Sequence, residues 1–460
     1  MYFFSTAKLR QFVVSGLFFL TLGFPIGVFA QNNSDKPVDT SWPTFLGADH
    51  NGKSNLKEIR KDWSDGKLKL LWQHETGQGY GIGSEANGKF YHFGRYGEDT
   101  RLTCLDCETG KSIWKFNYES NYDDMYGYDS GPRSTPVIDG NLVYIYGVEG
   151  QLHCLDANSG DLVWKKDLNK QFGVIKNFFG VGSTPTVFND LLIVMVGGSP
   201  EESKKVAPGR LNKVKPNGSG IVAFDKVTGE VRYQAVDDLA SYSSLQVADI
   251  NGTPTLLAWM RTSLYGLEPS TGEEKFSFYW RSKKLESVNA ATPVVIDDDL
   301  VLLTECYERG SVLLKIDPES DKPKVVWSDE NKRRTASLRS HWNTPIVVGD
   351  YAYGCSGEKT SSADLRCLNW KTGEVKWKYD KLSRASITWV DDHFVVMGEL
   401  GELLLIKANP EKIDIVTQYQ PGEGDNRIKF KYPCWAAPVI AEGKLFVRGK
   451  NKLACFELAE

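Results

Sequence analysis

A short turn that recurs along the chain constrains the fold more than any other feature. Residues 106–114, DCETGKSIW, return as residues 156–164, DANSGDLVW, and as residues 225–233, DKVTGEVRY. In such a turn an Asp side chain caps its own backbone, glycine takes a positive φ and the aromatic residue restarts a strand. Weaker copies of the turn occupy residues 268–276, 317–327 and 369–377. The pattern predicts one repeated β unit, with each aromatic side chain docked against the adjoining repeat.

The spacing of the turns predicts the number of repeats. From Asp106 to Glu457 is 351 residues over seven intervals, or about 50 per repeat, which is typical of propeller blades. The eighth repeat ends after its third strand, and residues 68–76, LKLLWQHET, supply the missing fourth. Such closure removes exposed sheet edges. We therefore predict an all-β, eight-bladed propeller of four-stranded antiparallel blades. Its first strands begin near Gly83, Thr135, Thr184, Ser244, Thr292, Thr344, Ile387 and Ala437.

One repeat is longer than the others. The interval from Asp156 to Asp225 is 69 residues, and the excess is residues 199–219, SPEESKKVAPGRLNKVKPNGS. This insertion lies between the second and third strands of the third repeat and carries five Lys or Arg against two Glu. It is either a solvated surface loop or a docking arm for an acidic partner.

The first 30 residues have the composition of a secretory signal peptide. Lys8 and Arg10 precede an apolar run, and small residues allow cleavage near Ala30. The alternative is an uncleaved membrane anchor, although Pro25 interrupts a run of marginal spanning length. We expect a signal peptide over 1–30, a leader and linker over 31–66, and a single propeller domain over 67–460. The mature chain is then exported to the periplasm or the cell surface, with no transmembrane segment.

The charge and the cysteines limit the partners and the chemistry. A net charge of −4 gives no reason to expect nucleic acid as a partner, because binding it requires a basic face. Four of the eight cysteines occupy the same position in four of the repeats, which indicates small buried hydrophobic residues rather than disulfide partners: Cys104, Cys154, Cys367 and Cys455. A bond between Cys355 and Cys367, on neighbouring strands, remains open. The pair Cys104 and Cys107 has metal-like spacing, but no second pair accompanies it.

Large polar side chains precede the innermost strands, where a blade needs only small residues. In a propeller these segments meet around one mouth of the channel, so a ligand site is expected there. The predicted ligand-binding residues are Arg133, Tyr242, Glu286, Asn289, His341, Asn343, Arg384 and Trp435. The candidates for a catalytic base are His341 and Asp129. In the structural alternative the two arginines pair with Glu286 or Asp129, His341 is a hydrogen-bonded core residue, and the tryptophans pack between blades.

Around eight blades, the Asp-x-x-Thr-Gly-x-x-x-Trp turn resembles that of the pyrroloquinoline-quinone (PQQ) repeat propellers. That family includes the quinoprotein alcohol dehydrogenases and BamB-like assembly lipoproteins. The start at residues 42–54, WPTFLGADHNGKS, is also similar to secreted PQQ-like proteins, so the resemblance covers residues 42–457. It implies a PQQ site with calcium, for which Glu286 and Asn289 are candidate ligands. The chain departs from the family in lacking two adjacent cysteines and in having Gln31 where BamB carries a lipidated cysteine.

Two functions therefore remain. The first is a binding or scaffold module that uses its rim loops and channel mouth to hold a protein partner or a small polar ligand. The alternative is a quinoprotein-type dehydrogenase that oxidises alcohols or sugars with PQQ and calcium. The missing cysteine pair favours the first.

Overall fold

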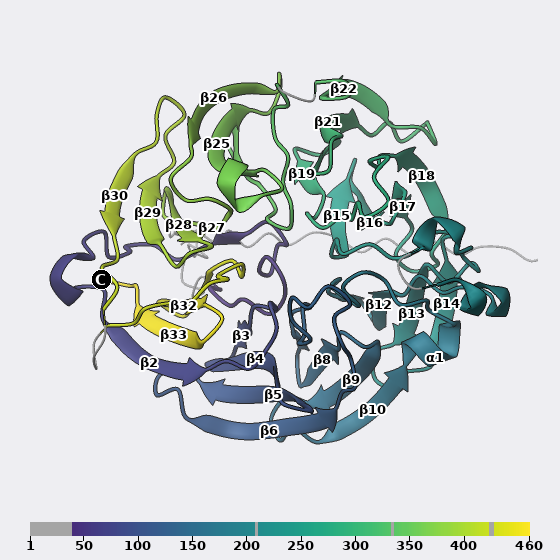
Figure 1. Cartoon of the computed structure of the whole chain (residues 1–460), viewed down its shortest axis with the longest axis horizontal. Coiled ribbons are helices and arrows are strands. Elements are labelled where there is room, and N and C mark those ends of the chain that lie inside the picture. The colour runs from purple at the N-terminus through teal and green to yellow at the C-terminus, as the bar shows by residue number, and fades with distance from the viewer. Residues whose placement is uncertain (1–38, 208–209, 333–334, 423–426) are drawn as a thin grey trace, which may run out of the picture. The chain divides into compact units, whose positions relative to one another are not determined.

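Eight antiparallel sheets follow one another around a ring in the computed structural model (Figure 1). The structure describes residues 39–207, 210–332, 335–422 and 427–460, so the predicted signal peptide lies outside it. Residues 39–460 form one compact unit. The prediction of an all-β, eight-bladed propeller is confirmed. Among the described residues, no helix has the length and apolar character needed to span a bilayer.

The first four blades each consist of four consecutive strands. Blade 1 contains β3 (Ser84–Ala86), β4 (Lys89–Tyr96), β5 (Asp99–Asp106) and β6 (Ser112–Glu119). Blade 2 contains β7 (Val137–Asp139), β8 (Leu142–Tyr146), β9 (Gln151–Asp156) and β10 (Leu162–Asp167). Blade 3 contains β11 (Thr186–Phe188), β12 (Leu191–Met195), β13 (Ile221–Asp225) and β14 (Val231–Ala235). Blade 4 contains β15 (Gln246–Ile250), β16 (Thr253–Trp259), β17 (Ser263–Leu267) and β18 (Glu274–Tyr279).

The remaining blades continue the same order. Blade 5 contains β19 (Val294–Ile296), β20 (Leu300–Glu305), β21 (Gly310–Lys315) and β22 (Lys324–Ser328). Blade 6 contains β23 (Ile346–Val348), β24 (Tyr351–Ser356), β25 (Asp364–Asn369) and β26 (Glu374–Tyr379). Blade 7 contains β27 (Ala385–Val390), β28 (His393–Gly398), β29 (Leu403–Lys407) and β30 (Ile415–Gln418). Blade 8 contains β31 (Val439–Ala441), β32 (Lys444–Arg448) and β33 (Lys452–Glu457).

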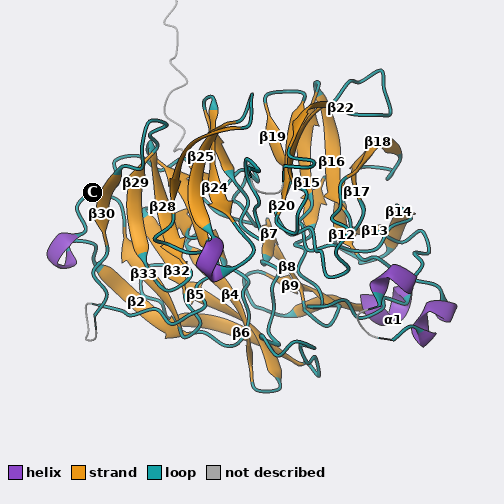
Figure 2. Ribbon diagram, turned by 45° about the horizontal axis from the view of Figure 1, so that its top comes forward, coloured by secondary structure: helices purple, strands orange, loops and turns teal. Residues whose placement is uncertain are grey.

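The ring closes as the sequence predicts. Strand β2 (Leu70–Glu75) pairs antiparallel with β33 and completes blade 8, with Trp72 opposite Cys455. Helical structure is confined to short segments, shown in purple in Figure 2. These are α1 (Leu168–Phe172) and the 3-10 turns η1 (Ser64–Gly66), η2 (Glu201–Lys205), η3 (Leu211–Lys213) and η4 (Thr360–Ser362).

The recurrent turn joins neighbouring blades. Asp106 accepts hydrogen bonds from the backbone N–H and the hydroxyl of Thr109, and Gly110 has a φ of +66°. The indole of Trp114 donates to the carbonyl of Ala157 in the next blade, at 3.2 Å. Four other tryptophans make the equivalent bond to a following blade: Trp72, Trp164, Trp327 and Trp377. The predicted docking of these aromatic residues is thus confirmed.

Residues 39–66, which the sequence predicts to be leader and linker, pack onto the propeller. Strand β1 (Lys53–Ser54) adds to the inner edge of blade 7 by pairing parallel with β27. Trp42 forms a bridge with Glu85 of blade 1, and Trp63 is only 1% exposed. The segment has no counterpart in the repeats, so the repeat pattern carries no signal for its packing. The compact unit begins at Asp39.

The insertion of blade 3 is also packed against the protein. It follows β12 and precedes β13, as predicted, and contains η2 and η3. Leu211 and Val214 are buried in one apolar cluster with Tyr242 and Tyr307. The insertion therefore supports the wall of the channel mouth from behind.

All eight cysteines are buried and free, which leaves the pair Cys355 and Cys367 unbonded. Cys104, Cys154, Cys367 and Cys455 are each fully buried, as predicted for small core residues. Burial raises the pKa of the Cys104 thiol to about 11, so this group stays protonated near neutral pH.

Candidate functional site

A cavity of about 610 Å³ lies where the segments leading into the innermost strands meet. Its lining includes residues that precede or begin the first strand of every blade, which places it on the axis of the ring. The volume is within the range of about 300–1,000 Å³ usual for small-molecule sites. Six of the residues predicted to bind a ligand line this cavity: Arg133, Tyr242, His341, Asn343, Arg384 and Trp435.

Aromatic side chains form a large part of the wall. The ring of Trp435 is central, with centroids 4.7 Å from Trp342 and 4.6 Å from Tyr80. Tyr128 and Tyr432 stand at the mouth, where they are 57% and 48% exposed. The aromatic residues of the lining beyond Phe45 are Tyr80, Tyr128, Phe179, Tyr242, Tyr307, Trp342, Tyr432 and Trp435. Such a wall offers a ligand large flat surfaces with few charges.

Arg384 is held in a buried ion pair. Its guanidinium lies 2.9 Å from the carboxylate of Glu399, whose side chain is fully buried. The same carboxylate accepts a hydrogen bond from the indole of Trp435 at 3.0 Å. Burial by itself raises the pKa of Glu399, but the hydrogen bonds from Arg384 and Trp435 outweigh this and hold the pKa below its usual value. The guanidinium also stacks over the Trp342 ring at 4.6 Å. Glu399 thus fixes both Arg384 and Trp435.

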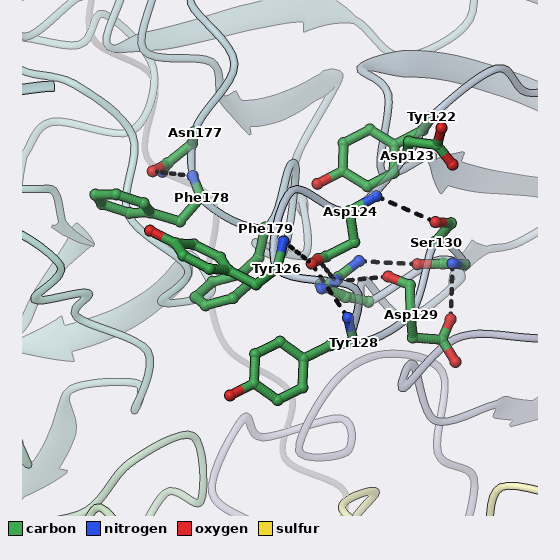
Figure 3. A network of polar contacts seen from close by, with 12 residues as sticks. Tyr122, Asp123, Asp124, Tyr126, Tyr128, Asp129, Ser130, Asn177, Phe178 and Phe179 are labelled. Atoms are coloured by element: carbon green, nitrogen blue, oxygen red, sulfur yellow. Dashed lines mark hydrogen bonds and ion pairs between the residues drawn. The ribbon is translucent and has the colours of Figure 1, made fainter. Parts of the chain in front are cut away.

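Arg133 is held in a second buried pair, with Asp124 of the loop shown in Figure 3. It lies 2.7 Å from Asp124, and the two side chains are 10% and 1% exposed. Asp124 also accepts the backbone N–H groups of Tyr126 and Tyr128 (Figure 3). Asp129 in the same loop accepts the N–H of Gly131. One carboxylate therefore neutralises Arg133 and fixes the backbone that carries Tyr128.

His341 is neutral in the site. Burial, with a smaller effect of the Arg384 charge, lowers its pKa to about 3. Its Nε2 lies 2.9 Å from the hydroxyl of Tyr307, and its buried Nδ1 has no partner among the described residues. Burial also raises the pKa of Tyr307, so both groups act as neutral hydrogen-bonding partners near pH 7. A histidine with this pKa is a weak base for proton abstraction.

Three predicted site residues do not line the cavity. Glu286 is exposed, and Asn289 is buried with its amide donating to the carbonyls of Met260 and Arg261. Asp129 is buried within the loop of Figure 3. The arginines pair with Asp124 and Glu399, so the predicted alternative partners Glu286 and Asp129 are not the ones used.

The floor of the cavity comes from a segment that the repeat pattern does not reach. Phe45 and Leu46 line the cavity. They belong to the N-terminal segment, purple in Figure 1, whose Pro43 carbonyl accepts the N–H of Ile138 in blade 2 and whose β1 joins blade 7. Because this segment contacts blades 1, 2 and 7, it runs across the channel and makes it a blind pocket. In the sequence, only the apolar character of residues 42–46, WPTFL, indicates that this segment packs against the propeller.

The lining does not fit PQQ with calcium. The candidate metal ligands Glu286 and Asn289 lie outside it, and no group of three His, Cys, Asp or Glu in the described part of the chain is arranged to hold a metal ion. PQQ is a tricarboxylate, yet both lining arginines already pair with protein carboxylates. A bound PQQ would leave its own charge uncompensated in an aromatic pocket.

Comparisons with known proteins place this architecture in a family. The model of the family described as outer membrane protein assembly factor BamB matches residues 98–379. The structure of BamB from Moraxella catarrhalis has a TM-score of 0.56 and 15% identity, covering 85% of this chain and 99% of that one. The computationally designed Ika8 protein has a TM-score of 0.53 and 9% identity, covering 85% of this chain and 99% of that one.

A quinohemoprotein alcohol dehydrogenase from Comamonas testosteroni has a TM-score of 0.49 and 13% identity, covering 91% of this chain and 80% of that one. A search of curated proteins finds no match. At these identities the structural similarities to BamB and Ika8 concern the fold, and the family match covers more than half of the chain.

Proposed function

This chain belongs to the family of the outer membrane protein assembly factor BamB, and on that premise we propose that it is an exported binding module that holds a small ligand in the blind cavity at its channel mouth. The observation that carries the proposal is the cavity itself, which is lined by Phe45 and Leu46 of the N-terminal segment and by aromatic rings that pack on one another. A preformed pocket of this kind binds without the ordering cost of a flexible site.

Neither candidate base, His341 or Asp129, is suited to accept a proton from a ligand in the cavity. His341 has a pKa of about 3 and a bond to Tyr307, whereas Asp129 lies outside the lining. The lining arginines are neutralised by Asp124 and Glu399. This arrangement supports binding over the quinoprotein-type oxidation of alcohols or sugars. The rim loops remain available to a protein partner, as suits a relative of an assembly factor.

Export is part of the proposal and rests on the sequence. The basic residues Lys8 and Arg10, the apolar run after them and the small residues at Ala30 support a cleaved signal peptide. The ligand would then be one that is present in the periplasm or at the cell surface. N-terminal sequencing of the protein recovered from the periplasm is expected to begin near Gln31.

Replacing Trp435 with alanine is expected to weaken binding of Nile red, a neutral apolar dye, by at least tenfold. Loss of one buried aromatic surface costs about 1.5–3 kcal/mol, which corresponds to roughly 10–100-fold in Kd. The measurement is a fluorescence titration of the full chain, in which the wild type should show one saturable site.

The matched control is Tyr279→Ala, which removes an aromatic side chain that is 60% exposed on β18 and does not line the cavity. It should leave the titration unchanged, and Trp435→Phe should retain most of the affinity if the fold is intact. Equal dye binding by the wild type and Trp435→Ala would contradict the proposal, because the dye would then occupy another surface.

A further inference from the structure

The deep part of the cavity is lined by residues with hydroxyl groups whose protons have no acceptor among the described residues. The hydroxyl oxygen of Thr184 accepts the backbone N–H of Thr135 at 3.1 Å, and that of Ser244 accepts the N–H of Thr184 at 3.1 Å. The hydroxyl oxygen of Thr344 accepts the backbone N–H of Thr292 at 3.0 Å. Because each oxygen is engaged by an N–H from the protein, its own proton is left to donate elsewhere. All three hydroxyl-bearing residues line the cavity.

Thr135 adds a fourth hydroxyl. It lines the cavity, its residue is 1% exposed, and within the described part of the chain its hydroxyl makes no hydrogen bond. These four residues precede the first strands of blades 2, 3, 4 and 6. A ligand that enters the cavity therefore meets O–H donors at its inner end and aromatic faces along its sides.

The charged side chains of the cavity wall have partners of opposite charge. Arg133 is paired with Asp124 and Arg384 with Glu399. Glu358 lies 3.3 Å from Lys284, which also lies 3.8 Å from Glu308. The remaining ionised group of the lining is Lys359, which is exposed at the rim. A charged ligand would lose its hydration here without gaining an opposite charge, at a cost of several kcal/mol. The interior therefore favours a neutral ligand.

We infer that the ligand is a neutral saccharide, with one end of the sugar chain seated in the blind cavity. This inference rests on the proposed function and specifies its ligand class. Sugar rings have flat C–H faces that pack on aromatic side chains and peripheral oxygens that accept hydrogen bonds. Exposed Tyr128 and Tyr432 would carry the sugar unit that follows outside the mouth. An acyl chain would leave the hydroxyl protons of Thr135 and Ser244 unpaired in an apolar contact.

The closed inner end of the cavity limits the length of the saccharide that can bind. Phe45 and Leu46 prevent a long polymer from threading through the ring, so only a chain end or a short oligosaccharide fits. The backbone of the Tyr128 loop is fixed by Asp124, which reduces the entropy lost on stacking (Figure 3).

The test is an array of neutral and acidic oligosaccharides probed with the full chain, followed by calorimetric titration of the best neutral glycan. We expect saturable binding of a neutral glycan and none of its carboxylated or sulfated counterparts. Thr135→Val is expected to weaken that binding about five- to tenfold, the worth of one hydrogen bond. Because the Thr135 hydroxyl has no partner among the described residues, this variant should fold normally. Tyr279→Ala, which lies outside the cavity, should leave glycan binding unchanged.

The possible failures are distinguishable. Binding of acidic glycans alone, binding of no glycan, or an unchanged titration for Thr135→Val would each overturn the saccharide inference. In any of these cases a Trp435-dependent Nile red site would still support the proposed function. Binding of a neutral peptide library in place of glycans would assign the cavity to a protein segment. Loss of the dye site as well would remove the proposed function itself.

Discussion

Glu399→Gln is expected to lower the free energy of unfolding by about 3–5 kcal/mol, because it leaves the Arg384 charge buried without its partner. The side chain of Glu399 is fully buried and that of Arg384 is 12% exposed, so water does not replace the lost carboxylate. The substitution keeps the size and shape of the side chain and removes mainly its charge. Urea unfolding of the two proteins at pH 7 measures the difference.

The matched control replaces both partners. Arg384→Met combined with Glu399→Leu is expected to unfold within about 1–2 kcal/mol of the wild type, since apolar residues often substitute for a buried pair at little cost. A Glu399→Gln variant as stable as the wild type would show that Arg384 reaches solvent, contrary to the site described above.

The difference in unfolding free energy between the wild type and Glu399→Gln is expected to depend on pH, because the pKa of Glu399 is lowered in the folded protein. The pKa of Glu399 in the folded protein lies below its unfolded value near 4.5. The stabilisation of the fold by the ionised Glu399 carboxylate is therefore fully present above about pH 4.5. It is lost as the pH falls through the pKa of this group in the folded protein. The gap between the wild type and Glu399→Gln should be constant from pH 6 to 8 and shrink in acid.

Trp72→Ala is expected to cost about 3–5 kcal/mol and to loosen the closure of the ring. Trp72 is the aromatic residue of β2, is 8% exposed, and donates its indole N–H to the carbonyl of Cys107 in blade 1 at 2.9 Å. Its ring also packs on Phe446 at 5.8 Å. Removing it opens a cavity at the seam between blades 8 and 1.

Two readouts separate this effect from a general loss of stability. Hydrogen exchange should show the amides of β2 losing protection before those of blade 3. Tyr279→Ala, at an exposed position of β18, should change the unfolding free energy by less than about 0.5 kcal/mol. A Trp72→Ala variant with normal protection in β2 would contradict the account of closure.

The fold was predictable because its determinants are local and repeated. The Asp106 turn, the glycine that follows it and the docking of Trp114 lie within nine residues and recur with one spacing. The missing strand of blade 8 was predictable for the same reason, since residues 68–76 match a fourth strand. The N-terminal segment that carries Phe45 has no repeated counterpart, and its packing depends on contacts with several blades.

The site was only partly predictable because the repeat fixes where a segment lies and not which side chain faces the axis. In the segment that leads into the first strand of blade 5, Val288 and Ala290 line the cavity, while the amide of Asn289 between them donates to the carbonyl of Met260. The partner of Arg384 is Glu399, which follows β28 in the same blade and belongs to no recurrent position. Packing of side chains in three dimensions decides both outcomes.

The most direct test of the central claim is a Nile red titration of Ala437→Trp, which fills the cavity from the inner edge of blade 8. Ala437 lines the cavity and is only partly buried, so a large side chain there projects into the space that a ligand would occupy. The account predicts at least a 20-fold loss of affinity with the melting temperature little changed, and the same loss for Ala290→Trp in the segment that leads into blade 5. Unchanged affinity in both variants would contradict it, because the ligand would then bind outside the blind cavity.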